Sequence, residues 1–268
     1  MESSIKIDQG VDWTAPWLST LSPLGREVAS SPHWRDALNQ RAARIGLLNH
    51  RRLPVQFVPQ SELPDGVSYE MHISTSGCVP TRDNLHDFFN ALVWLTFPRT
   101  KAQLNALQAA QIVRLGIGKS RGPARDAATL FDENAALLAV SETQNGRELV
   151  DALRAHRWNE VFLDHRPRFN QEAEVLLFGH ALMEKLANPY KAITAHSLVC
   201  WVSPDFHHLA LSEKCALLDE NIAVQLTDRE LLPGWFSPLP VLGVPDWCIG
   251  QGAEFYADTA IFRPARFG

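Results

Sequence analysis

Short extended segments are scattered among more numerous helical patterns, and this arrangement limits the fold more than any other feature of the chain. Strands are predicted at residues 67–75 and 193–202, where apolar and β-branched residues alternate or run together. Residues 128–131 and 135–140 fit a hairpin around an Asp-Glu-Asn turn. The chain lacks the regular alternation of strand and helix that builds a parallel α/β sheet. The sequence therefore predicts an α+β fold, mainly helical, with a small mixed or antiparallel sheet.

Helical periodicity accounts for much of the remaining chain. Apolar residues recur at helical spacing in residues 33–48, 83–97, 98–115, 146–162, 172–187 and 212–226. Residues 13–24 are predicted to be irregular, and residues 54–58 to be extended. Residues 233–264 begin with a stretch rich in Pro, Trp and Gly, which predicts an irregular C-terminal tail on the surface.

Composition and charge narrow the classes of function. The 268 residues are 46% hydrophobic and 21% charged, which is ordinary for a globular protein with a sizeable core. No linker, charge block or repeat marks a boundary, so we expect one domain over residues 1–268, with about residues 1–12 disordered. The formal net charge of −5 disfavours general nucleic-acid binding, which relies on a basic field.

The chain carries no pattern for export or membrane insertion. Residues 1–10 lack the apolar core of a signal peptide. The longest apolar run, residues 88–97, is too short to span a bilayer. The four cysteines are far apart and form no Cys-x-x-Cys pair, which predicts reduced thiols. We therefore expect a cytoplasmic protein without a membrane partner.

The predicted helix at residues 83–97 has an unusual polar face. Its apolar side is a normal core face: Leu85, Phe88, Phe89, Leu92 and Leu95. The opposite side holds Asp83, His86, Asp87, Asn90 and Trp94. A helix exposed to solvent would more typically carry Lys, Glu, Gln and Ala there, because His, Asp and Asn are weaker helix formers. These residue types indicate that a defined geometry matters more here than helix stability.

Two interpretations of this polar face remain open. His86, Asp87 and Asn90 would suit a metal site or an oriented base, because a histidine and a carboxylate on one helix face can share an ion. Alternatively, the acidic residues favour the positive helix N-terminus while His86 and Asn90 bond to the neighbouring chain.

A second pair of ionisable residues lies in the predicted helix at residues 172–187. His180 and Glu184 are four residues apart, and Gly179 comes just before them. Glycine within a helix costs about 1 kcal/mol relative to alanine, so Gly179 predicts the close approach of another backbone or a ligand. The pair fits half of a metal or acid–base site, or a His–Glu contact made for packing.

Basic side chains gather around the loop predicted at residues 116–123: Arg114, Lys119, Arg121 and Arg125. Such a cluster would suit a carboxylate or phosphate group, although a solvated basic loop paired with neighbouring acids is the alternative. Asp132 and Glu133 would supply oxygens to a metal ion, or form the polar tip of the predicted hairpin.

Several longer motifs resemble a known family. Residues 79–95, 97–101 and 104–105 are similar to the hallmark of an uncharacterised bacterial family, Domain of Unknown Function 3025. Further similar stretches are residues 125–126, 129–133, 178–182, 184–186, 189–196, 238–243, 255–256 and 262–264. The similar stretches cover most of the chain from about Tyr69 onward. The resemblance implies one domain over the whole chain, and it brings no activity. The chain has Gln108 where the family often has His, and Ala135 where the family often has Gly. The first departure weakens any scheme with a histidine ligand at that position.

The favoured hypothesis is a hydrolase-like enzyme with a polar site between helices, acting on an anionic small molecule. The catalytic candidates are His86, Asp87, Asn90, His180 and Glu184. The substrate-binding candidates are Arg121, Arg125, Trp94 and Lys101. A divalent metal is the one cofactor considered, with His86, Asp87, His180 and Glu184 as candidate ligands.

The alternative is a non-catalytic protein that binds a ligand or another protein. Its polar clusters would then fix how helices and strands pack. The eight tryptophans and the Pro-rich tail would form an apolar docking surface. The shape of the site separates the two hypotheses, because convergent polar groups in a cleft favour an enzyme and a flat aromatic patch favours docking.

Overall fold

The structure is a computed structural model that describes residues 6–115, 123–228 and 231–265. Its main sheet has four strands in the order β4-β3-β5-β6. The central strand β3 (Ala135–Ser141) pairs in parallel with β5 (Thr194–Val202) and antiparallel with β4 (Ala173–Leu177). The edge strand β6 (Phe236–Pro240) runs antiparallel to β5. The fold is α+β with a mixed sheet, as the sequence predicts.

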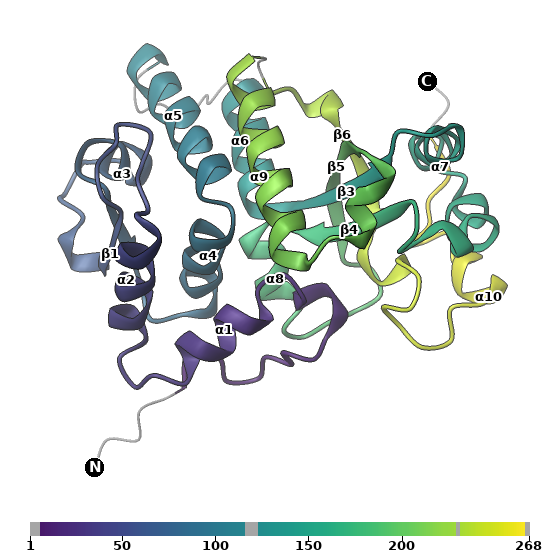
Figure 1. Cartoon of the computed structure of the whole chain (residues 1–268), viewed down its shortest axis with the longest axis horizontal. Coiled ribbons are helices and arrows are strands. Elements are labelled where there is room, and N and C mark those ends of the chain that lie inside the picture. The colour runs from purple at the N-terminus through teal and green to yellow at the C-terminus, as the bar shows by residue number, and fades with distance from the viewer. Residues whose placement is uncertain (1–5, 116–122, 229–230, 266–268) are drawn as a thin grey trace.

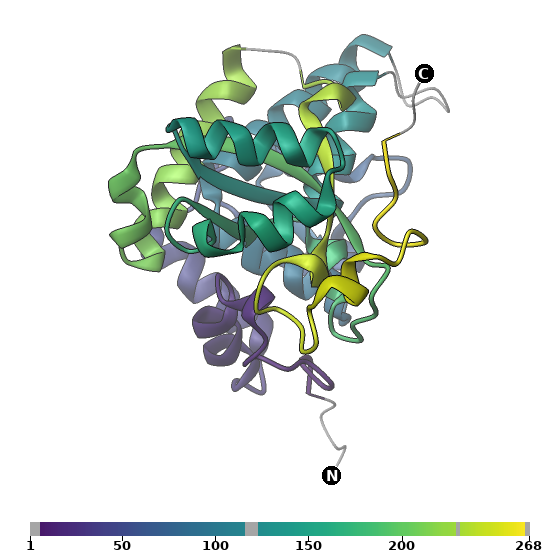
Figure 2. The ribbon, with the colours of Figure 1, turned by 90° about the vertical axis from the view of Figure 1, so that its right-hand side faces the viewer.

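Helices cover both sides of this sheet. Helix α7 (Gln144–Arg154) lies across one face, as Figure 2 shows. On the other side lie α4 (Leu85–Thr96), α5 (Pro98–Leu115), α6 (Pro123–Asn134) and α9 (Leu211–Asp228) (Figure 1). The short helix α8 (His180–Lys185) follows β4 and packs against α4 and α6. This contact brings residues far apart in sequence to one place.

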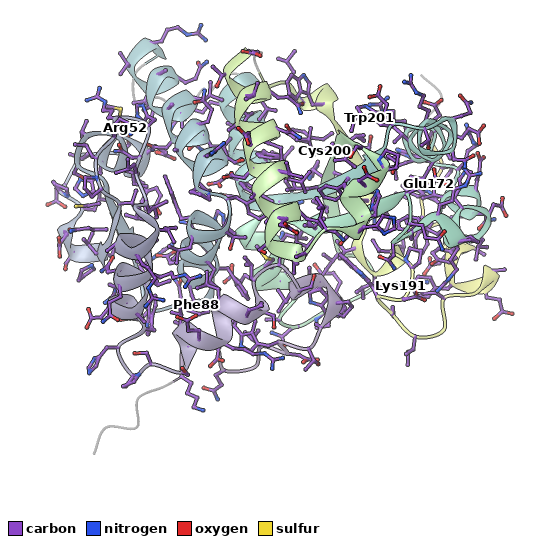
Figure 3. The ribbon with its side chains drawn as sticks, in the orientation of Figure 1. Arg52, Phe88, Glu172, Lys191, Cys200 and Trp201 are labelled. Atoms are coloured by element: carbon purple, nitrogen blue, oxygen red, sulfur yellow. The ribbon has the colours of Figure 1, made fainter. Side chains whose placement is uncertain are left out.

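A smaller layer stands beside and below α4 and α5, at the left and lower centre of Figure 1. It contains α1 (Ser22–Ala29), α2 (Trp34–Ile45), α3 (Tyr69–Ser76) and a two-stranded parallel sheet of β1 (Gln56–Pro59) and β2 (Cys78–Thr81). Figure 3 labels Phe88 at the lower end of α4, beside α1. Its ring meets those of Trp13 and Trp34 edge-on, at centroid distances of 6.4 and 5.6 Å. Buried apolar residues from Leu18 to Phe262 form one continuous cluster.

The strand predicted at residues 67–75 is wrong, because these residues enter helix α3. Ser68 caps this helix by accepting a hydrogen bond from the Met71 amide, and Gly77 ends it at a φ of +79°. The predicted hairpin is also wrong in its first half. Residues 128–134 form the last turns of α6, and β3 finds its partners elsewhere in the chain. Short apolar runs do not separate strand from helix by periodicity alone.

Three later predictions also change. Residues 172–187 form β4 and then α8 rather than one helix. The helix predicted at 146–162 is α7, which is followed by a π-helical turn at Glu160–Asp164. The C-terminal tail is not wholly irregular, because it supplies strand β6 and the short helix α10 (Ala253–Tyr256). The predictions at residues 83–97, 98–115, 193–202 and 212–226 are confirmed as α4, α5, β5 and α9.

Candidate active site

A polar cavity of about 300 Å³ lies where α3, α4, α6 and α8 approach one another. Its wall carries two imidazoles and four carboxylates: His86, His180, Glu70, Asp87, Asp132 and Glu133. Tyr69, Arg82, Asn90 and Gln108 also line it. Convergent polar groups in a cavity of this size are typical of a small-molecule site.

The first turn of α4 is held by local hydrogen bonds that involve Asp87. The Asn84 side chain caps the helix by accepting from the Asp87 amide at 2.8 Å. The Asp87 carboxylate accepts from the Arg82 amide at 2.7 Å, and from Nε and Nη2 of the Arg82 guanidinium at 3.0 and 2.9 Å. A two-point contact of this kind fixes both side chains. The negative charge of Asp87 is therefore paired with the positive charge of Arg82, and Arg82, which precedes the helix, fixes the orientation of the Asp87 carboxylate.

His86 joins a chain of three side chains across α4 and α8. Its Nδ1 lies 2.9 Å from Oε2 of Glu184, and its Nε2 lies 3.1 Å from Nε2 of His180. The two rings meet edge-on at an angle of 81°. Two imidazole nitrogens at this distance are joined by one hydrogen bond, in which one ring donates and the other accepts.

Burial sets the charge state of His180. Only 5% of this residue is exposed. The cost of burying a charge lowers the pKa of His180 to about 4, although the Asp132 carboxylate opposes this shift. His180 is therefore neutral at pH 7. His86 is the more accessible of the two rings, because 30% of its side chain is exposed to solvent.

Lys101 is buried beneath the cavity wall and holds two of its residues, Asn90 and Asp132, by hydrogen bonds. Its buried ammonium donates to Oδ1 of Asn90 at 2.8 Å and also to Asp132. Burial alone would raise the pKa of Asp132, but the positive charge of Lys101 and the hydrogen bond from its ammonium hold that pKa below its ordinary value. Asn90 extends this hydrogen-bond network to Tyr69, because its Nδ2 donates to the Tyr69 hydroxyl at 2.9 Å.

Tyr69 presents a hydroxyl donor to the cavity. Burial and the nearby carboxylates of Asp87 and Asp132 raise the pKa of Tyr69 far above its ordinary value. The phenol therefore keeps its proton. Since Asn90 donates to the phenol oxygen, the phenol proton is left for another acceptor.

The structure brings together the five catalytic candidates from the sequence. His86, Asp87, Asn90 and His180 line the cavity, and Glu184 holds His86. Gly179 precedes α8 rather than lying within a helix, but the predicted close approach is confirmed. A Cβ there would lie 2.5 Å from the Ala135 nitrogen.

The substrate-binding candidates are placed differently. Trp94 is 2% exposed, and the Lys101 ammonium lies 5.4 Å from its ring centroid, behind the cavity wall. Arg125 is buried on α6 and is not among the described residues that line the cavity. Arg121 lies outside the described residues. Asp83, at the start of the polar stripe, turns away and pairs with Arg35.

The four candidate metal ligands do not form a ligand set. Asp87 is held by Arg82, and the two histidines contact each other through their Nε2 atoms. Within residues 6–115, 123–228 and 231–265, no three His, Cys, Asp or Glu side chains are grouped to hold a metal ion.

Sequence reasoning missed Tyr69 and Arg82, and it misjudged Asp132. Tyr69 falls in the segment predicted as a strand, so its approach to Asn90 had no visible signal. Arg82 precedes the polar helix within the family-like motif, and that proximity was a usable signal. Asp132 lies in the last turn of α6 rather than at a hairpin tip.

Fold and site together define an α+β protein whose helices enclose a cavity lined with histidines and carboxylates. A family model described as "Protein of unknown function (DUF3025)" matches residues 55–266, and the chain belongs to this family. No curated protein and no solved structure matches the chain. Among the helices described, none has the length and apolar character needed to cross a bilayer.

Proposed function

We propose that the cavity is the active site of a hydrolase-like enzyme that uses acid–base catalysis on a small molecule. The observation that carries this proposal is the Glu184–His86–His180 chain, with contacts of 2.9 and 3.1 Å, at the wall of a polar cavity. A carboxylate that orients a histidine, which in turn faces a cavity, is a recurring arrangement for proton transfer.

In this scheme the two histidines accept a proton from an attacking water molecule. The water reaches an imidazole nitrogen by displacing the 3.1 Å contact between the two Nε2 atoms. His86 is the more accessible acceptor, because His180 is almost fully buried. The Glu184 carboxylate at Nδ1 of His86 orients the ring and balances the positive charge that forms on it.

Tyr69 supports the same chemistry from another side of the cavity. Hydrolysis of an ester, amide or phosphate develops negative charge on oxygen in the transition state. A fixed hydroxyl donor facing that oxygen stabilises the charge. Lys101 and Asn90 act through Tyr69 and Asp132 as positioning residues, since their polar atoms are engaged with other side chains of the site.

Among the described residues, no broad aromatic surface supports the docking alternative. It requires an aromatic surface, but Trp201 is the only one of the eight tryptophans that is more than about a third exposed. The proposed function therefore rests on the cavity.

The test is a hydrolysis screen with chromogenic substrates of four classes: p-nitrophenyl acetate, p-nitrophenyl phosphate, bis(p-nitrophenyl) phosphate and a p-nitroanilide. We expect turnover of one class, and a loss on the order of 10²- to 10⁴-fold in His86→Ala. Glu184→Gln should lose about 10- to 100-fold, as expected for a residue that orients another. His208→Ala is the matched control, because His208 is exposed and lies outside the cavity. Absence of turnover in all four substrate classes would contradict the proposal. An equal loss of activity in His86→Ala and His208→Ala would contradict it as well.

A further inference from the structure

The charges on the cavity wall do not balance, and the excess is negative. Of the four carboxylates, Asp87 is paired with Arg82, the one cationic side chain among the described residues of the wall. Asp132 uses Oδ1 to accept from Lys101. Glu70 and Glu133 have no ion-pair partner within the described part of the chain. Among the described residues, the wall therefore presents two carboxylates that no cationic side chain pairs with.

A buried amide gives an independent indication of a ligand. Gln108 is 7% exposed and lines the cavity. None of the hydrogen bonds between described residues involves its side chain, and its amide atoms are not among the polar atoms that are fully buried without a partner, so they are open to the cavity. Its carbonyl oxygen is the kind of acceptor that a bound N–H group would satisfy.

The geometry favours an organic cation over a metal ion. A divalent cation needs several oxygens or nitrogens at one point, and the described side chains provide no such group. The carboxylates instead come from different elements around a cavity of about 300 Å³, Glu70 from α3 and Glu133 from α6. Spaced acceptors match a molecule with N–H donors, such as an ammonium or guanidinium group on a short carbon chain.

We infer that this cavity binds a small organic cation through the carboxylates of Glu70 and Glu133 and the side-chain oxygen of Gln108. The inference rests on the proposed function, in which this cation is the substrate class of the hydrolytic site. It replaces the anionic substrate expected from the sequence, because Lys101 is engaged behind the wall and Arg125 does not line the cavity.

The test compares three probes of similar size that differ in charge: 1,5-diaminopentane, 1,5-pentanediol and glutarate. Binding to the full-length protein is measured by isothermal titration calorimetry at low salt. We expect the diamine to bind at least about tenfold more tightly than the diol or glutarate, and to weaken as ionic strength rises. Tighter binding of glutarate, or equal binding of diamine and diol, would overturn the inference.

Variants locate the binding. Glu133→Gln and Glu70→Gln should each weaken diamine binding about three- to tenfold, and Gln108→Leu should also weaken it. Glu142→Gln is the matched control. Glu142 follows β3 at its far end, whereas Glu133 comes just before it, and Glu142 pairs with Arg147 at the surface. Diamine affinity that is unchanged in Glu133→Gln, or equally reduced in Glu142→Gln, would refute this site.

The binding measurement also separates this inference from the proposed function. Calorimetry detects the diamine without turnover. Selective diamine binding without hydrolysis in the substrate screen would contradict the enzyme proposal alone. Hydrolysis that depends on His86, in a protein that does not prefer the diamine, would overturn the cation inference alone.

Discussion

Replacing Lys101 with methionine tests how the cavity wall is held together. Lys101 is 4% exposed on its side chain, and its ammonium is bonded to Asp132 and Asn90. Lys101→Met keeps most of the aliphatic volume but removes the positive charge. The variant leaves the Asp132 carboxylate, 17% exposed, without its cation and leaves the Asn90 carbonyl oxygen without its donor.

The expected cost is large because a buried charge loses its partner. Removing one member of a buried ion pair costs about 3–5 kcal/mol, mostly from the charge left behind. Because the Asp132 side chain is partly exposed to the cavity, we expect the cost of Lys101→Met in unfolding free energy near the lower end of this range, at about 3 kcal/mol. Asp132→Asn should have a similar cost, because it leaves the Lys101 ammonium unpaired. The double variant should cost clearly less than the sum, since no buried charge remains.

Urea unfolding followed by tryptophan fluorescence measures these free energies, and the pH dependence gives a second reading. In the wild-type protein the lowered pKa of Asp132 contributes stability above about pH 4, which is lost as the pH falls through the folded-state value. In Lys101→Met burial raises the pKa of Asp132, so the deficit should shrink as acid protonates the carboxyl. A cost below about 1 kcal/mol, typical of an exposed pair, would refute this account. Strict additivity in the double variant would refute it as well.

Three further predictions concern the elements that carry the site. Gly179→Ala should cost about 1–3 kcal/mol, because its Cβ would lie within 2.6 Å of the Asn134 backbone. Gly234→Ala, which meets nothing within 4 Å, should be close to neutral, and urea unfolding of both variants compares them. The pKa of His180, lowered by burial to about 4, should remove up to about 3 kcal/mol of stability as pH falls from about 6.5 to 4. His180→Asn should flatten that pH profile in the same assay, and an unchanged slope would assign it to other groups. Asn84→Ala should cost about 1 kcal/mol through loss of the α4 cap, and a neutral result in thermal unfolding would show that the cap is dispensable.

The polar helix shows how far local sequence reasoning reaches. Its apolar face, its acidic first turn and its stop before Pro98 all depend on residues within a few positions of one another, and α4 follows them closely. His86, Asp87 and Asn90, the unusual residue types on the opposite face, line the cavity. Gly179, just before His180, also predicts a close backbone approach. The structure has the backbone of Asn134 and Ala135 there, so only a residue without Cβ fits.

Local reasoning failed where short segments have two stable conformations. Residues 67–75 alternate well enough for a strand, but the caps at Ser68 and Gly77 and packing against α5 make residues 69–76 a helix. That error hid Tyr69. The sequence predicts residues 128–131 as the first strand of a hairpin and Asp132 at its turn, whereas the structure has Asp132 on helix α6, where it bonds to Lys101. Tertiary contacts choose between such alternatives, and periodicity over a few residues does not.

The sequence by itself determined the fold class, the helices α4, α5 and α9 and the strand β5. It also singled out the candidate residues His86 and His180, although it placed His180 in a helix longer than α8. Only the tertiary structure decided which of these residues meet. His86 and Glu184 are 98 positions apart and lie on different helices, and the hydrogen bond between them exists because α8 packs against α4. The charge of the cavity also depends on the tertiary structure. Lys101 is buried in an ion pair with Asp132, whereas Glu70 and Glu133 line the wall. Residue types are local properties of a chain, whereas distances between elements and the fields they create arise from packing.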